Sequence, residues 1–172
     1  EPDRRRDGAR AKRLSLADAA RLSPAFWRVT GIASLMALAR CSEAFLVLRA
    51  ADLGLAVGQA PWVMVVMTLV YTAAAYPAGA ALDRGHGTTM LYAGLASLMA
   101  AHVTLAVAAG PAAVFAGAAL WGLHMGLTQG IFSAMVAGHA PEDLRGSAFG
   151  VFNLASGAAM LVASGVAGAL WD

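Results

Sequence analysis

Charged residues are scarce in this chain of 172 residues. They make up 13% of the sequence, against 59% hydrophobic residues, whereas a soluble domain usually carries about 25% charged residues. A water-soluble globule of this size could not hide so much apolar surface. The composition therefore excludes an ordinary soluble enzyme. The single cysteine, Cys41, excludes an intramolecular disulfide framework.

Several signatures of chemistry are also missing. The sequence has no Gly-x-x-x-x-Gly-Lys-Ser/Thr loop, no Gly-x-Ser-x-Gly nucleophile elbow, and no His or Cys pair at metal-ligand spacing. We therefore expect no catalytic residue, no metal and no cofactor. The formal net charge of +2 does not indicate a nucleic-acid partner, because the basic residues cluster in one tail.

The N-terminal part of the chain holds more than half of the charged residues. Twelve charged residues lie within residues 1–28, and we interpret residues 1–23 as a basic cytoplasmic linker. Ser15 and Asp18 have the spacing of a capping box, which predicts a short helix over residues 15–22 on the membrane surface. Two roles stay open for the tail: a contact with anionic lipid, or a solvated linker whose charges orient the chain.

Five long apolar runs follow the tail. Each has at least the roughly 20 residues that an α-helix needs to cross the hydrocarbon core. Their richness in Ala, Leu, Gly and Met, without alternation, disfavours strands. The sequence predicts an all-α polytopic transmembrane bundle over residues 24–172. Its spans are expected at about 26–48, 60–82, 88–109, 112–138 and 147–171.

The basic residues predict the orientation of these spans. With the tail in the cytoplasm, residues 83–87 and 139–146 are cytoplasmic, and residues 49–59 lie outside. Ten of the twelve Lys and Arg residues then lie on the cytoplasmic side. This asymmetry follows the positive-inside rule.

One pair of opposite charges lies within a predicted span. Arg40 and Glu43 are three residues apart, which on a helix places them on neighbouring parts of one face, where they can pair. Protonation of Glu43 would free Arg40 to bind something else. A proton or cation relay and a static ion pair near the membrane interface are both open interpretations.

Small residues follow helical spacing in the last two runs. Gly122, Gly126 and Gly130 predict close approach by another helix. Gln129 shares their stripe, whereas His124 points to nearly the opposite side, so the two are not expected to serve one small site. The last run has a small, weakly polar face that suits a helix partner or a water-accessible path. That face includes Gly146, Gly150, Asn153 and Gly157.

Two loops resemble motifs of major facilitator superfamily transporters. Residues 77–87 are similar to the Gly-x-x-x-Asp-Arg-x-Gly motif between adjacent helices of each half. Gly79, Asp83 and Arg84 match that motif, whereas His86 stands where the later glycine is usual. Residues 140–150 resemble the loop between the tenth and eleventh helices. In order and spacing the chain resembles helices seven to eleven, with the tail as the linker between the two halves.

The resemblance implies alternating access, in which two helical bundles rock around a midplane site. It implies that Gly79, Asp83 and Arg84 form a conformational-switch loop, although a capped and charged helix end is the alternative. It also implies proton-coupled transport of a small organic solute, with export favoured over uptake, in a bacterial cytoplasmic membrane. The implied partners are the solute, protons, the lipid bilayer, and the missing N-terminal half or another subunit, with no nucleic acid.

Within this hypothesis, Arg40 and Glu43 are the coupling candidates. Gln129, Asn153 and His124 are the candidates for lining the cavity. Two other classes stay open: a non-transporting scaffold or assembly subunit that uses its glycine stripes, and an integral-membrane enzyme. Five helices cannot supply the two bundles that alternating access requires. We therefore expect a fragment of a longer protein, or a chain that assembles with another copy or a partner.

Overall fold

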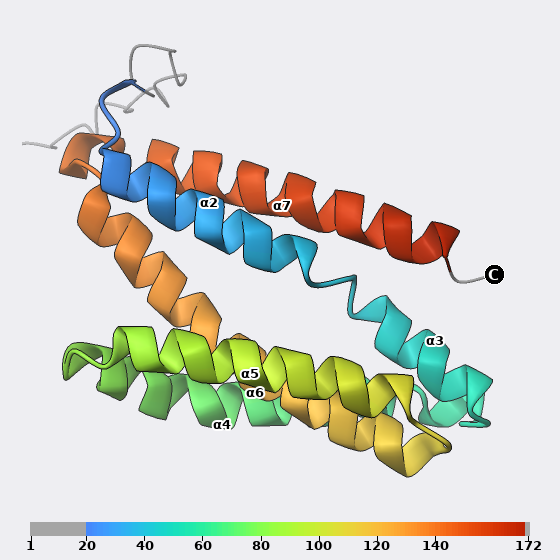
Figure 1. Cartoon of the computed structure of the whole chain (residues 1–172). Helices are drawn as coiled ribbons and strands as arrows, with labels where there is room; N and C mark the ends of the chain where they lie inside the picture. The colour runs from blue at the N-terminus through green and yellow to red at the C-terminus, as the bar shows by residue number, and fades with distance from the viewer. Residues whose placement is uncertain (1–19, 171–172) are drawn as a thin grey trace, which may run out of the picture.

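The computed structural model describes residues 20–170, and every regular element in that range is helical (Figure 1). This confirms the predicted all-α class. The tail with its proposed capping box at Ser15 lies outside the described residues. The helices are α2 (Pro24–Leu38), α3 (Ala44–Asp52), α4 (Pro61–Asp83), α5 (Gly87–Ala106), α6 (Pro111–His139) and α7 (Arg145–Ala169), with short 3-10 turns at Val57–Gln59 and Glu142–Leu144.

Four helical segments among residues 20–170 are long and apolar enough to cross a membrane. They are α4, α5, α6 and the segment Glu142–Ala169 that contains α7, and they coincide with four of the five predicted spans. The prediction of one continuous helix for the first span is wrong. That run folds as α2 and α3, separated by residues 39–43, and the two pieces follow one another along the molecule in Figure 1.

Proline and serine set where several helices begin. The side-chain oxygen of Ser23 accepts a hydrogen bond from the backbone N–H of Phe26 at 3.1 Å, and Pro24 occupies the first turn of α2. Helices α4 and α6 begin at Pro61 and Pro111. A first-turn proline removes a donor that would have no partner there and presets the backbone for a helix.

Helix α6 joins two packing units. Helices α4 and α5 pack along one part of it, whereas α2 pairs with α7 near its other end (Figure 1). Trp121 of α6 lies in the larger buried cluster, and Val136 of the same helix lies in the smaller one with Phe26. Because lipid tails are as apolar as these side chains, close packing stabilises both clusters more than exclusion of water does.

The glycines of α6 differ in what they contact. A Cβ on Gly122 would overlap the carbonyl oxygen of Met67 on α4, and a Cβ on Gly126 would lie 2.7 Å from the Cβ of Ala74. Added Cβ atoms would meet nothing within 4 Å at four other glycines of the predicted packing faces. For these four, contact with another helix stays a prediction: Gly130, Gly146, Gly150 and Gly157.

Charged side chains gather at one end of the helices. The start of α2, the α4–α5 turn and the α6–α7 loop all lie at that end in Figure 1. A side-chain nitrogen of Arg21 donates to a carboxylate oxygen of Asp143 at 2.9 Å, and the hydroxyl of Ser23 donates to the carbonyl oxygen of His139 at 3.0 Å. The start of α2 is therefore tied to the loop that precedes α7.

Candidate functional site

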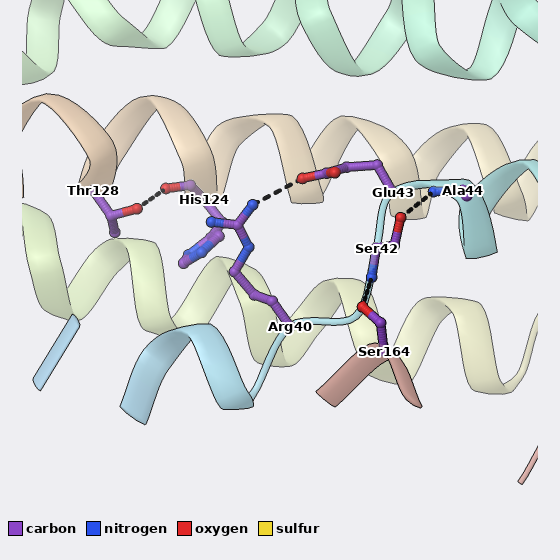
Figure 2. A network of polar contacts seen from close by, with 7 residues as sticks. All are labelled: Arg40, Ser42, Glu43, Ala44, His124, Thr128 and Ser164. Carbon is purple, nitrogen blue, oxygen red and sulfur yellow. Dashed lines mark hydrogen bonds and ion pairs between the residues drawn. The ribbon is translucent and has the colours of Figure 1, made fainter. Parts of the chain in front are cut away.

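The break between α2 and α3 is the first part of the site. It contains neither glycine nor proline, and hydrogen bonds of Ser42 stabilise its non-helical conformation. The backbone N–H of Ser42 donates to the hydroxyl oxygen of Ser164 on α7 at 3.0 Å, and the Ser42 hydroxyl accepts from the N–H of Ala44 at 3.3 Å (Figure 2). Peptide groups freed inside a membrane need such partners.

Arg40 and Glu43 extend from this break and pair with each other. Nη2 of Arg40 donates to Oε1 of Glu43 at 2.9 Å (Figure 2), and the two side chains are 14% and 25% exposed. The pair expected from the sequence is present, but both residues belong to the non-helical segment rather than to one helix face. Nε of Arg40 is buried and has no hydrogen-bond partner among the described residues.

His124 lies one helix away, on α6. Its side chain is 1% exposed, and its Nδ1 lies 2.9 Å from the carbonyl oxygen of Gly94 on α5. A carbonyl oxygen only accepts, so Nδ1 carries the hydrogen in the neutral ring and Nε2 is left as an acceptor. Thr128, one turn further along, donates from its hydroxyl to the carbonyl oxygen of His124 at 2.8 Å.

A cavity of about 430 Å³ brings these groups together. Helix α2, the break, α6 and α7 all contribute to its lining. The sequence predicted that His124 and Gln129 do not serve one small site. Both residues line this cavity, and His124 also bonds to the neighbouring helix α5. The cavity extends around α6, so side chains on different faces of the helix reach it. Five predicted residues line it: Arg40, Glu43, His124, Gln129 and Asn153.

The cavity also has members that were not among the candidate site residues. Thr128, Ser133 and Ser156 belong to its lining, and Phe132 and Phe152 form part of an apolar wall. The hydroxyl of Ser156 already donates to the carbonyl oxygen of Phe152 at 2.7 Å. In the sequence, the only signal for these lining residues was Ser and Thr at helical spacing. That signal is weak, because such hydroxyl groups often bond to the backbone of their own helix.

The predicted switch loop lies away from this cavity, at the charged end. Gly79, Asp83 and Arg84 are exposed, and no ion pair joins Asp83 or Arg84 to any residue within 20–170. A Cβ on Gly79 would meet nothing within 4 Å, whereas Gly85 makes the turn with a φ of +84°. The role of this loop in switching stays a prediction.

A metal centre is absent from the part of the chain that the structure describes. No group of three His, Cys, Asp or Glu side chains lies close enough together there to hold a metal ion. The candidate site is a cavity lined by polar and apolar side chains, with one ion pair. Its chemistry depends on hydrogen bonds, charge and apolar contact.

Apolar helices around a cavity that holds an ion pair are typical of a helical membrane protein with a polar cavity. The family model described as Major Facilitator Superfamily matches residues 6–172. The chain therefore belongs to the major facilitator superfamily, whose members are transporters rather than enzymes, and the family that the sequence predicted is confirmed. Comparisons with curated proteins and with solved structures gave no match.

Proposed function

We propose that this chain forms one side of the solute pathway in a proton-coupled secondary transporter, with export favoured over uptake. The observation that carries the proposal is the cavity that joins the Arg40–Glu43 pair to the amides of Gln129 and Asn153. Ionisable side chains in a membrane are costly and usually face a pathway or a cavity. A volume of about 430 Å³ suits a small organic molecule.

Glu43 is the proposed proton carrier. Its ionised carboxylate accepts a hydrogen bond from Arg40 at 2.9 Å, and protonation removes the charge that attracts the guanidinium. An arginine stays charged at physiological pH. The pair therefore responds to protons through Glu43, and a protonated Glu43 leaves donors of Arg40 available to a solute.

Alternating access needs a second helical bundle, and α7 is the proposed contact with it. In the segment that contains α7, no residue of the apolar stretch that is long enough to cross a membrane is buried. The small residues Gly146, Gly150 and Gly157 face open space. We assign this face to the missing N-terminal half or to another subunit.

The charged end is proposed to lie in the cytoplasm of a bacterial cell, with the tail on the same side. This follows the positive-inside rule, because Arg21, Arg28, Arg84 and Arg145 all lie at that end. The loop of Gly79, Asp83 and Arg84 would then lie on the cytoplasmic face, where it can take part in opening and closing.

The test of proton coupling is Glu43→Gln. Gln keeps the size of the side chain and is neutral, like protonated glutamic acid. The native polypeptide that carries this chain is reconstituted into proteoliposomes, and a pH-sensitive dye inside them reports proton movement when candidate solutes are added. We expect the variant to lose solute-driven proton movement while exchange of labelled solute continues.

The matched control for this test is Glu142→Gln, which removes an exposed carboxylate at the charged end. The control is expected to behave like the wild type. Proton movement that is unchanged in Glu43→Gln would contradict the coupling role of Glu43.

A non-transporting scaffold is the second candidate, and the open face of α7 favours it. A scaffold predicts that the protein requires a partner subunit for stability and that no solute raises its melting temperature. Accumulation of a solute against its gradient contradicts the scaffold and supports transport.

A further inference from the structure

We propose that the cavity binds a compact organic monoanion, a monocarboxylate with an apolar body, and moves it together with one proton. The proposal rests on the proposed function and names the substrate class of that same site. It is carried by the juxtaposition of a titratable carboxylate, a permanent cation and an apolar wall in one cavity.

The charge of the cavity lining is the first argument. Three lining side chains are charged or titratable: Arg40 and Glu43 from the break, and His124 from α6. The lining residues of α2 and α7 carry no charge, and Cys41 lines a different cavity. Because Arg40 is always charged, the total is zero when Glu43 is ionised and positive when Glu43 is protonated. The lining is never negative, so it attracts anions and repels cations.

The unmet hydrogen-bonding capacity of Arg40 is the second argument. A guanidinium has five N–H donors, and the hydrogen bond from Nη2 to Glu43 is the one that the Arg40 side chain makes among the described residues. Nε is buried with no partner. A carboxylate can accept two parallel N–H bonds from a guanidinium. An anionic solute would therefore satisfy donors that the described residues leave unpaired.

Competition for Arg40 couples the anion to the proton. A carboxylate beside Arg40 and an ionised Glu43 would place two negative charges against one positive charge in a poorly solvated site. A proton from water, bound to a carboxylate oxygen of Glu43, restores neutrality and releases Nη2 to the solute. The loaded cavity then holds one proton and one anion, which move in the same direction. Export therefore runs on the outward gradient of the solute itself.

The rest of the cavity limits the size and charge of the anion. Met36, Phe132, Phe152 and Met160 supply apolar contact within a volume of about 430 Å³. A dianion would leave one of its charges unpaired, because the lining offers a single permanent cation and a buried His124. The wall and the charge together favour a monocarboxylate whose body is a short alkyl chain or one ring.

The test uses matched probes that differ in charge and little in shape. Butyrate, hexanoate and benzoate are compared with their amides and with butylammonium, hexylammonium and benzylammonium. The readout is the ligand-induced rise in melting temperature of the purified native polypeptide in detergent, measured across pH. We expect carboxylates alone to stabilise the protein, with affinity rising about tenfold for each pH unit lowered while Glu43 is ionised in the free protein.

Variants separate the two residues of the pair. Glu43→Gln should bind carboxylates at alkaline pH as tightly as the wild type does in acid, with no dependence on pH. The double variant Arg40→Gln/Glu43→Gln, which leaves no unpaired charge, should lose carboxylate binding. His124→Gln should keep the pH slope. The exposed Arg145→Gln at the charged end is the control and should match the wild type.

Several outcomes would overturn the proposal. Equal stabilisation by amides or ammonium probes, or no response to any carboxylate, contradicts the monoanion. A pH slope that survives in Glu43→Gln, or that His124→Gln removes, contradicts Glu43 as the linked proton site. Solute-driven proton movement in proteoliposomes is measured separately, so the substrate class can fail while proton-coupled transport stands.

Discussion

The contact between α4 and α6 yields a sharp prediction, because two glycines on one helix surface differ completely in their surroundings. A methyl group at Gly122 would overlap the carbonyl oxygen of Met67, and it would lie 3.0 Å from the carbonyl carbon of the same residue. A methyl group at Gly130 would meet nothing within 4 Å. The perturbation is Gly122→Ala, and Gly130→Ala is its matched control.

Two effects of opposite sign determine the magnitude. Replacing a helical glycine with alanine stabilises a helix by about 1 kcal/mol, and Gly130→Ala should show up to that gain. Overpacking costs about 1–3 kcal/mol. The atoms that the methyl group meets at Gly122 belong to the backbone of α4 and cannot rotate away, so the cost lies at the upper end. We expect Gly122→Ala to lower the free energy of unfolding by about 1–2 kcal/mol.

The assay is reversible unfolding in mixed micelles, in which increasing SDS unfolds the helices and intrinsic tryptophan fluorescence follows the transition. Trp121 precedes Gly122 in the sequence and is buried in the same cluster as Met67, so its fluorescence reports on the packing of this region. The two variants should differ by about 2–3 kcal/mol in opposite directions. Equal stability of Gly122→Ala and Gly130→Ala would refute the argument that α4 and α6 approach through Gly122.

Two further predictions concern single turns. Ser23→Ala removes the acceptor for the N–H of Phe26 and the donor to His139. It should cost about 1–2 kcal/mol of unfolding free energy in the same SDS titration. Ser23→Thr keeps the hydroxyl and should retain most of that stability, and an equal loss in both variants would contradict the capping role. Gly85→Ala forces alanine to a φ of +84° and should cost about 1–2 kcal/mol. Gly79→Ala lies inside α4, where the added methyl meets nothing within 4 Å, so like Gly130→Ala it should stabilise by up to about 1 kcal/mol. Equal effects of the two glycine variants would contradict the turn argument.

Helix class and membrane insertion were predictable from the sequence because both depend on local properties. A run such as residues 61–83 contains enough apolar residues to cross a membrane, and only a helix satisfies its backbone there. The starts at Pro24, Pro61 and Pro111 follow from the backbone of proline itself. The two loop motifs were sufficient to indicate the family that the family model confirmed.

The break at residues 39–43 was not predictable, because its cause lies far away in the sequence. No glycine or proline marks it, and the hydrogen bond that supports it comes from Ser164, 122 residues further along the chain. The joint presence of His124 and Gln129 in one cavity depends on the tertiary structure for a similar reason. A helical wheel placed His124 and Gln129 on different faces, and only the arrangement of α2, α6 and α7 made both faces line one cavity.

The sequence by itself determined that this chain is an all-helical membrane protein of the major facilitator superfamily, and it indicated Arg40 and Glu43 as a pair. Apolar length, helix starts and charge spacing are properties of neighbouring residues. The tertiary structure decided that the pair lies in an unwound segment, that Gly122 contacts α4 while Gly130 does not, and which polar groups share a cavity. These features depend on how helices cross, because a glycine or an ion pair acquires its role from the element that packs against it.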